Sequence, residues 1–486
     1  MTFNSFGFIL LLLPLFIVAM QLTKRITIGK PRYREACKVV IIAFSLAFYA
    51  PFGVKNIAVL AASILINAVG ARFLFGKRNK AFLAVLLAVN VGALLFFKFN
   101  GFFFPVAVSF YTFNQISYIV DIYRGDAPEF SLPDYLAYIL FFPKILQGPL
   151  MGYGKFVEKL DKALETGDAG GRVKAVDYEM ALRAMLLLSM GLFKKVILAD
   201  TFGRAVDYGY DNLMTLGSME AILVAVFYSI QLYFDFSGYC DMAAAVCMMI
   251  GFDLPENFNS PYKAVNIVDF WKRWHISLTR FFTKYVYIPL GGNRKGAMRM
   301  YINFMIVFLL SGLWHGSGWT FIVWGAMHGV LYVITRAVSA GAVAGIDVKK
   351  ESVIGRGVKV LLTFIYVTVA WVFFRANTIS DAVTLLTRVF TGGAKRISTG
   401  ISACFQLDEL WYIIKVTPLM KMGFVWEICL WLFLLVSVAV IFFSRNAIEI
   451  AKTCRIGVKT TVFTAVLLVW SIVSFAGVST FLYMNF

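Results

Sequence analysis

The sequence predicts an all-α protein that crosses a membrane many times. Of its 486 residues, 60% are apolar or aromatic and only 15% are charged, and the mean hydropathy is +0.77. Globular proteins average about 45–50% apolar and about 25% charged residues, and a soluble fold could not cover so much apolar surface. The same composition excludes a disordered chain, a collagen-like chain and a small disulfide scaffold.

The charge of the chain is strongly positive. Lys and Arg number 46 against 27 Asp and Glu, a formal net charge of +19. Most basic residues lie in short clusters between apolar runs, which is typical of cytoplasmic loops that face anionic headgroups. No usual recognition motif accompanies them, so we expect no nucleic-acid partner. The six cysteines form no C-x-x-C pair, and we expect buried thiols instead of disulfides or zinc ligands.

The first apolar run, residues 6–20, is followed directly by the basic cluster of residues 24–34. This order predicts a retained transmembrane helix with a cytoplasmic C-terminal end and an external N-terminus. Because a span needs about 20 apolar residues, we expect about 11–13 spans within one membrane domain, residues 1–486. The candidate spans are residues 5–22, 37–52, 54–70, 81–98, 102–120, 181–199, 219–236, 301–315, 319–335, 358–374, 425–444 and 460–483.

Two further segments break the pattern of apolar spans. Residues 134–151 contain Phe-Phe-Pro and Gly-Pro steps, so we expect this segment to re-enter instead of crossing. Residues 152–178 are polar and are expected to form a surface helix and loop. The chain shows no internal repeat, which disfavours an inverted-repeat transporter.

Residues 252–300 are polar, basic and expected to be cytoplasmic. After a turn-rich stretch, residues 266–285 have the periodicity of one amphipathic helix, with apolar side chains in a sector of about 80° and basic ones in a separate sector of about 120°. Residues 262–300 contain eight basic residues and a single acid, Asp269. This helix is too charged to span and is suited to the membrane interface.

The three histidines of the chain, His275, His315 and His328, lie close together in the sequence. Histidine is the usual proton-transfer residue near neutral pH. Each could instead be a neutral histidine bonded to a neighbouring helix, and His275 could be an interfacial side chain. A metal or haem site is disfavoured, because no carboxylate or cysteine stands at ligand spacing.

Residues 301–337 are expected to be core helices that carry two of these histidines. His315 precedes Gly316 and Gly318, which disfavour a continuous helix, and irregular backbone at membrane depth normally lines a cavity. His328 lies beside the G-x-x-x-G pattern of residues 325–329, which lets another backbone or a substrate approach closely.

Three aspartates lie in apolar surroundings: Asp200, Asp235 and Asp241. Each could orient a helix, pair with a basic side chain, or support a functional group. The sequence leaves these structural and functional roles open.

The motifs, taken in order, resemble the membrane-bound O-acyltransferases, and among them the bacterial branch of alginate O-acetyltransferases. They extend over roughly residues 100–375. The matching stretches are residues 108–113, 141–149, 191–200, 233–241, 255–258, 270–278, 288–294, 313–316 and 328–329.

The resemblance implies an O-acyltransferase whose helices surround a central funnel or tunnel. It makes His328 the active-site histidine and general base, His275 a second polar residue that positions or polarises the acyl carbonyl, and His315 the additional histidine of the alginate-type branch. Further side chains in the motifs could hold the histidines or line the substrate path: Asn257, Trp274 and Trp314.

The resemblance also implies substrates and partners. Acetyl-CoA is expected as donor substrate, with no bound cofactor, and its phosphates would be attracted by Lys272, Arg273 and Arg280. An SGNH-type periplasmic or membrane-anchored partner is expected to pass the acyl group to a polysaccharide such as alginate, at a bacterial inner membrane. The alternatives are D-alanyl or peptidoglycan acyl transfer, a transporter or flippase with a histidine relay, and a non-catalytic scaffold.

Overall fold

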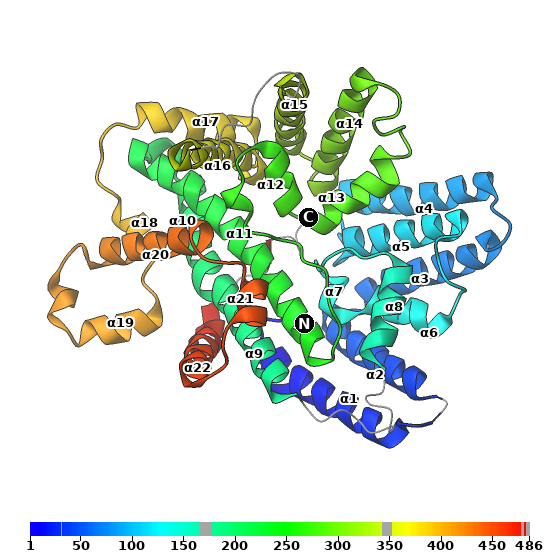
Figure 1. The fold of residues 1–486 in the computed structure, drawn as a ribbon. Helices are drawn as coiled ribbons and strands as arrows, with labels where there is room; N and C mark the ends of the chain where they lie inside the picture. The colour runs from blue at the N-terminus through cyan, green and yellow to red at the C-terminus, as the bar shows by residue number, and fades with distance from the viewer. Residues whose placement is uncertain (31, 166–176, 343–351, 478–480, 483–486) are drawn as a thin grey trace.

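The computed structural model describes residues 1–30, 32–165, 177–342, 352–477 and 481–482, which form helices and loops without a strand (Figure 1). Ten helices in this part of the chain are long and apolar enough to cross a membrane, which confirms the predicted class. They are α1 (Leu13–Thr27, extended by a π-helix from Gly7), α2 (Tyr33–Tyr49), α3 (Val54–Leu74), α4 (Lys80–Phe99), α11 (Ser218–Met249), α14 (Ala297–His315), α15 (Trp319–Ala342), α16 (Val353–Arg375), α20 (Val425–Phe442) and α22 (Val458–Val473).

Two of the twelve expected spans are not among these ten helices. Residues 102–120 contribute to α5 (Val108–Arg124), which carries buried polar side chains such as Asn114 and Gln115 and is enclosed by protein. Residues 181–199 form α9 (Tyr178–Phe193), which continues into a π-helix, η3 (Lys194–Ala199). Hydropathy detected both segments as apolar, but it cannot separate lipid-facing helices from helices buried in protein.

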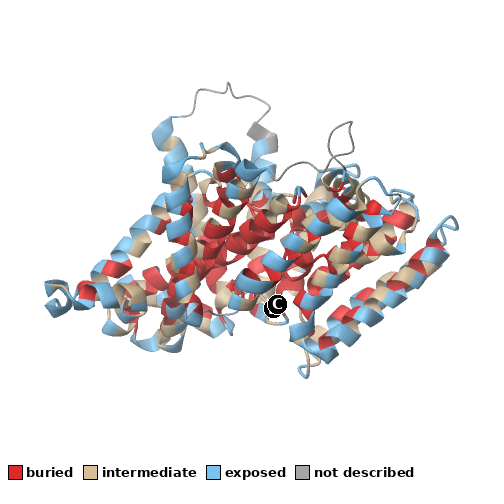
Figure 2. Cartoon of the chain, turned by 90° about the horizontal axis from the view of Figure 1, so that it is seen from below, coloured by how far each residue is buried: buried red, intermediate tan, exposed pale blue. Residues whose placement is uncertain are grey.

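The 32-residue helix α11 runs through the middle of the molecule and is the most enclosed of the ten, with 89% of its apolar window buried. Figure 2 shows buried residues concentrated in the centre and exposed residues on the outer helices. Outer helices such as α3 and α4 expose apolar side chains, including Leu65, Val85 and Phe96. These apolar surfaces suit contact with lipid.

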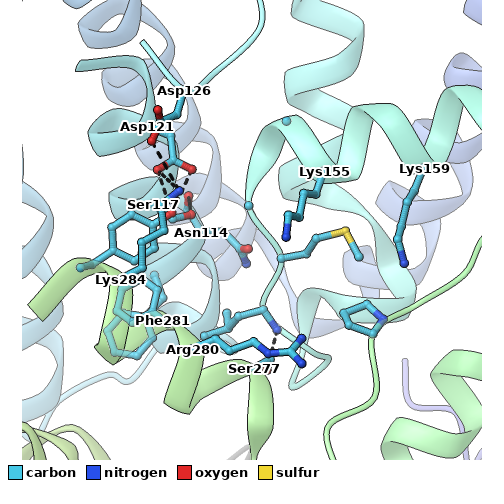
Figure 3. A pocket seen from close by; sticks show the side chains of 17 residues that line it. Asn114, Ser117, Asp121, Asp126, Lys155, Lys159, Ser277, Arg280, Phe281 and Lys284 are labelled. Carbon is cyan, nitrogen blue, oxygen red and sulfur yellow. Dashed lines mark hydrogen bonds and ion pairs between the residues drawn. The ribbon is translucent and has the colours of Figure 1, made fainter. Parts of the chain in front are cut away.

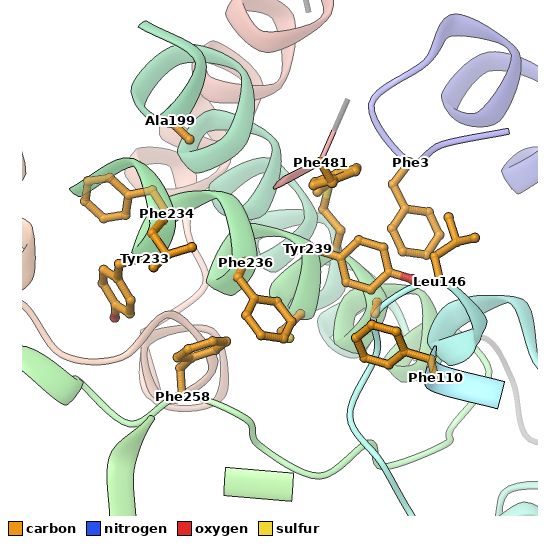
Figure 4. Packing of buried hydrophobic residues seen from close by; sticks show 14 of the residues in the cluster. Phe3, Phe110, Leu146, Ala199, Tyr233, Phe234, Phe236, Tyr239, Phe258 and Phe481 are labelled. Atoms are coloured by element: carbon orange, nitrogen blue, oxygen red, sulfur yellow. The ribbon is translucent and has the colours of Figure 1, made fainter. Parts of the chain in front are cut away.

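Two glycines allow α9 to pack closely on α11. A Cβ atom at Gly191 would lie 2.8 Å from the carbonyl oxygen of Gly238, and a Cβ at Gly238 would lie 2.8 Å from the carbonyl oxygen of Gly191. Nearby, Tyr239 of α11 packs between Phe3 and Phe481, at ring distances of 5.0 and 5.3 Å (Figure 4). Both ends of the described chain therefore help to close the core around α11.

Buried ion pairs attach η3 to α11. Lys194 Nζ lies 2.6 Å from Asp241, and Lys195 Nζ lies 2.7 Å from Asp235 and 2.8 Å from Asp200. The pairing accounts for all three aspartates that the sequence singled out. Because a buried charge is costly unless it is paired, these contacts select one packing of η3 against α11.

Several basic segments meet on one side of the helices, which we call the basic face. Lys159 of α8 (Tyr153–Ala163) pairs with Asp253, and Lys452 of α21 (Ala447–Thr453) also reaches Asp253. Arg34 approaches Asp161, and Lys263 donates to the carbonyl of residue 444. Segments that are far apart in the sequence therefore meet on one face, as the alternating direction of the spans requires.

The segment expected to re-enter is broken and buried. Residues 134–151 contain the end of α6 (Leu132–Leu140), a break at Phe141 and the short α7 (Phe142–Ile145), before the chain returns to α8, which packs on α6. The expected surface helix of residues 152–178 is α8, and residues 166–176 lie outside the described residues.

The prediction of one continuous amphipathic helix over residues 266–285 is wrong. The chain forms α12 (Ile267–Arg273), breaks at Trp274 and His275, and continues as α13 (Ile276–Phe282) and a π-helix, η6 (Thr283–Tyr287). Trp274 is extended, and His275 adopts a left-handed conformation with φ 45°. The apolar stripe also packs inward, since α12 contacts α15, so burial against protein decided the geometry.

Candidate active site

The structure brings the three histidines into one buried region from three different elements. His275 sits at the break between α12 and α13, His315 ends α14, and His328 lies within α15. Their exposed fractions are 1%, 3% and 0%. Because α14 and α15 form a hairpin and α12 packs on α15, three separate motifs supply one site.

Two tryptophans link the imidazoles. The Trp314 ring centroid lies 4.5 Å from that of His315 and 6.3 Å from that of His275. The Trp324 ring lies 5.1 Å from His315 and 5.0 Å from His328. The histidines and indoles therefore form one continuous layer, which we call the histidine layer.

His328 is oriented by a hydrogen bond from α12. Trp271 Nε1 donates to His328 Nδ1 at 3.3 Å. An indole N–H can only donate, so Nδ1 accepts and a neutral imidazole carries its proton on Nε2. Among the described residues, Nε2 of His328 has no hydrogen-bond partner. This nitrogen is therefore available to a ligand that enters the layer.

The glycine pattern around His328 brings two helix backbones together. A Cβ at Gly325 of α15 would lie 2.5 Å from the carbonyl oxygen of Phe308, and a Cβ at Gly312 of α14 would lie 2.4 Å from that of Phe321. The close approach that the G-x-x-x-G pattern of α15 predicted is therefore made by the backbone of α14. It fixes the distance between the helices that carry His315 and His328.

His275 is held by Asn257. Its Nδ1 lies 3.3 Å from Asn257 Oδ1, which also accepts from the backbone N–H and the hydroxyl of Ser277, at 3.1 and 2.8 Å. Because an amide oxygen only accepts, Nδ1 of His275 carries the proton. The left-handed conformation of His275 is stabilised by a further bond from Ile276 N to Asn257 O at 3.0 Å.

A basic pocket of about 420 Å³ opens beside this network (Figure 3). Ser277 and Arg280 of α13 line it, together with Lys155 and Lys159 of α8, and we call it the α8–α13 pocket. Both lysine side chains of α8 extend along one side of the space. The pocket lies on the basic face and combines cationic side chains with a partly apolar wall.

Acidic groups tie down the opposite side of the α8–α13 pocket. Asp121 accepts from Lys284 Nζ at 2.7 Å and from the Tyr285 hydroxyl at 2.9 Å. Burial and the Asp121 carboxylate raise the pKa of Tyr285, so its phenol remains a neutral donor. Lys284 is thereby paired with a carboxylate, whereas Lys155 and Arg280 have no acidic partner within ion-pair distance among the described residues.

The wall between the α8–α13 pocket and the histidine layer is one aromatic stack thick. Phe281 stacks on Phe113 at 4.4 Å, and Phe113 stacks on Trp314 at 5.2 Å. The imidazoles do not themselves line this pocket. The stack of Phe281, Phe113 and Trp314 therefore connects the lining of the pocket to the histidine layer.

The remaining predicted residues fall into separate groups. Trp274 is buried and packs at 5.0 Å on Trp371, whose ring lies 6.0 Å from that of His328. Arg280 lines the α8–α13 pocket, whereas Lys272 and Arg273 line a different hollow. The three predicted donor-binding cations are thus not brought together.

Several residues near the site were missed by sequence reasoning. Trp324 lies one helical turn before His328, and this i, i+4 spacing could have identified it. Lys155 and Lys159 share the same spacing on α8. The contacts of Trp271 and Ser277 carried no comparable sequence signal, because both depend on partners distant in the chain.

Metal binding has no geometric support in the part of the chain that the structure describes. No group of three or more His, Cys, Asp and Glu side chains there is arranged to hold a metal ion. The six cysteines are all free thiols, and four of them are buried.

Fold and site define a polytopic membrane protein with three histidines buried in its core, and residues 127–376 match the MBOAT, membrane-bound O-acyltransferase, family model. The chain is 36% identical over 397 residues to the peptidoglycan O-acetyltransferase of Helicobacter pylori, covering 72% of this chain and 73% of that protein. It is 34% identical over 426 residues to the probable alginate O-acetylase AlgI of Pseudomonas putida, covering 82% of each. The teichoic acid D-alanyltransferase of Streptococcus thermophilus is 28% identical over 253 residues, covering 48% and 57%. The chain belongs to the membrane-bound O-acyltransferase family and is a multi-pass membrane O-acyltransferase.

Proposed function

We propose that this enzyme takes an acetyl group from acetyl-CoA at the basic face and passes it to a hydroxyl acceptor on the opposite side of a bacterial inner membrane. The acetyl group then reaches a polysaccharide through an SGNH-type partner. The observation that carries the proposal is the network Ser277–Asn257–His275, which joins the α8–α13 pocket to the histidine layer. The names of two relatives, an alginate O-acetylase and a peptidoglycan O-acetyltransferase, support the acetyl group and the polysaccharide.

The α8–α13 pocket suits the phosphate-bearing part of the donor. Lys155, Lys159 and Arg280 present cationic groups to it, and phosphate groups pair well with such side chains. Lys159 also pairs with Asp253, so Lys155 and Arg280 carry most of the attraction. The thioester arm would pass the stack of Phe281 and Phe113 to reach the histidines.

In the proposed reaction the acceptor hydroxyl gives its proton to His328 Nδ1 while its oxygen attacks the thioester carbonyl. For this step the hydroxyl must replace Trp271 Nε1 as the partner of His328 Nδ1, so the bond that orients the ring breaks during the reaction. The carbon–sulfur bond then breaks, and the CoA thiolate takes the proton from the imidazolium. His275 acts by position, because a neutral ring with its proton on Nδ1 offers no donor at Nε2 to polarise a carbonyl.

The test is His328→Ala in cells that O-acetylate their polymer, with the amount of membrane protein held equal. Loss of general-base catalysis costs about 10²–10⁴-fold in rate, so polymer acetylation should be lost. Unchanged acetylation would remove His328 from the mechanism.

The native chain and His328→Ala, each purified and reconstituted in proteoliposomes, separate the alternatives. Acetyl-CoA labelled in the acetyl group should lose its label to an acceptor in proteoliposomes of the native chain but not of His328→Ala. Solute flux without acyl transfer would instead indicate a transporter. A scaffold would tolerate alanine at all three histidines, and use of a D-alanyl donor in place of acetyl-CoA would indicate D-alanyl transfer.

A further inference from the structure

A second basic hollow lies between α12, α15 and α16, with a volume of about 460 Å³. We call it the α12–α16 hollow. It contains neither a histidine nor any residue of the α8–α13 pocket. Its cationic side chains are Lys272 and Arg273 of α12, Arg336 of α15 and Arg356 of α16.

The charges in this hollow are unbalanced. Asp269 is the one carboxylate among the described residues that line it, and it already pairs with Arg273 Nε at 2.9 Å. Lys272, Arg336 and Arg356 then remain without a carboxylate among the described residues, and Arg336 also lies over the rings of Phe304 and Tyr332. Like charges that share a hollow repel each other, and a bound anion removes that repulsion. Arginine in particular presents a planar fork that matches the oxygens of a phosphate.

The start of α16 adds to this positive potential. Arg356 lies in the first turn of a 23-residue helix, just after the N-cap Ser352, whose hydroxyl accepts from Gly355 N at 3.0 Å. The N-terminal end of a helix carries partial positive charge and favours anions. Hydroxyl and amide groups also line the hollow, beside two valines: Asn266, Thr335 and Ser339.

The α12–α16 hollow is connected to the active site through one short helix. Lys272 and Arg273 follow Trp271 directly, and Trp271 donates to His328. An anion held between α12 and the ends of α15 and α16 therefore restrains the helix that orients His328. The hollow is thus placed to affect the enzyme without contacting the reacting groups.

We propose that the α12–α16 hollow binds a phosphate-bearing anion at a site separate from the donor pocket, and that this anion stabilises α12. The ligand chemistry is a phosphate or diphosphate group, supplied by a phospholipid headgroup or by a soluble phosphate compound. The inference goes beyond the proposed function, since binding can be measured without acyl transfer.

The experiment uses the full chain, purified in detergent, with Arg336→Gln/Arg356→Gln as the test variant. Inorganic pyrophosphate, measured by calorimetry, probes the soluble source. Retention of phosphatidylglycerol over phosphatidylcholine, measured by native mass spectrometry, probes the lipid source. Loss of two charge-assisted contacts should weaken binding by at least about tenfold. The matched control is Arg455→Gln/Lys459→Gln, which removes two exposed basic residues elsewhere on the basic face and should bind like the native chain.

Each outcome supports the proposal or overturns it. Pyrophosphate binding that depends on the two arginines indicates a soluble ligand, and arginine-dependent lipid retention indicates a headgroup. Failure of the native chain to bind either probe, or equal binding by the test variant, overturns the proposal. An increased KM for acetyl-CoA in the test variant would assign the α12–α16 hollow to the donor site. It would overturn the proposal that the hollow is separate from the α8–α13 pocket. Arg336→Lys/Arg356→Lys keeps the charge and should retain binding, which excludes misfolding as the cause of a loss.

Discussion

At the scale of single residues, Asn257 has the most consequential position in the site. Its side-chain oxygen contacts His275 and both donors of Ser277, so one amide connects the histidine layer to the α8–α13 pocket. Asn257 is itself buried, with an exposed fraction of 1%. Because Asn257 Oδ1 is enclosed, water cannot take its place as hydrogen-bond acceptor unless the break between α12 and α13 rearranges.

Asn257→Ala is expected to reduce acyl transfer by about 10²-fold, because a displacement of about 1 Å of a reacting group can cost that much. The measurement is single-turnover transfer from labelled acetyl-CoA in proteoliposomes. As a positioning residue, Asn257 should affect the transfer rate and leave donor binding nearly unchanged. Asn257→Asp keeps an acceptor oxygen and should recover part of the rate, whereas a merely structural role predicts no such rescue.

The control for this prediction is Asn212→Ala. Asn212 caps the end of α10 (Asp200–Asp211), and its side-chain amide donates to the carbonyl of Tyr208 in the same helix end. Activity equal to that of the native chain is expected. Equal activity of Asn257→Ala and the native chain would contradict the positioning role.

At the scale of elements, the packing of α9 and η3 on α11 depends on small residues and on buried charge pairs. Gly191 and Gly238 face each other backbone to backbone, and Lys194 and Asp241 pair beside them. The contact therefore combines close approach with a specific electrostatic register. Neither feature acts alone, since the ion pair forms only when the helices lie this close.

Gly238→Ala is expected to lower the free energy of unfolding by about 1–3 kcal/mol, the usual cost of overpacking, because its Cβ would lie 2.8 Å from a backbone oxygen. The measurement is thermal unfolding in detergent. Gly92→Ala in α4 is the matched control, since nothing lies within 4 Å of its Cβ position. That variant should be unchanged or stabilised by up to about 1 kcal/mol through helix propensity. Equal destabilisation of the two would contradict the packing argument.

Asp241→Asn should destabilise the fold by about 3–5 kcal/mol, because it leaves the buried Lys194 ammonium without a counter-charge. Asp207→Asn is the matched control: Asp207 pairs with Arg375 at 2.7 Å but is 62% exposed. An exposed pair contributes about 0–1 kcal/mol. Similar unfolding temperatures for the two variants would show that burial does not determine the value of the pair.

At the scale of the whole molecule, the collection of basic loops on one face sets the orientation in the membrane. The basic face holds both the α8–α13 pocket and the α12–α16 hollow. By the positive-inside rule we expect this face to be cytoplasmic, the side from which the proposed phosphate-bearing donor would enter. The orientation and the proposed chemistry therefore support each other.

Cysteine labelling tests this orientation. Lys77→Cys and Lys459→Cys place thiols on the basic face, and Arg396→Cys places one on the opposite side, in the segment between α17 (Ile379–Thr391) and α18 (Thr399–Ala403). A membrane-impermeant maleimide should label Arg396→Cys in intact cells and the other two only after permeabilisation. The native chain provides the background, since four of its six cysteines are buried. The reverse pattern would invert the proposed direction of transfer.

The site could be predicted from the sequence only in part. Histidines in an apolar chain are rare enough to draw attention, and all three enter one buried region. Their hydrogen bonds could not be predicted, because Trp271 and His328 are joined across 57 positions. The same reason separates Arg280 from Lys272 and Arg273: charge periodicity places them on one helix face, but the break at His275 directs them to different pockets.

The sequence by itself determined that the chain is a helical membrane protein with its three histidines between residues 252 and 337, because hydropathy and charge are local properties. Only the tertiary structure decided which apolar helices are enclosed by protein, how the amphipathic segment breaks, and which side chains meet around His328. These outcomes depend on close packing between segments distant in the chain, and no local pattern encodes which segment will supply the contact.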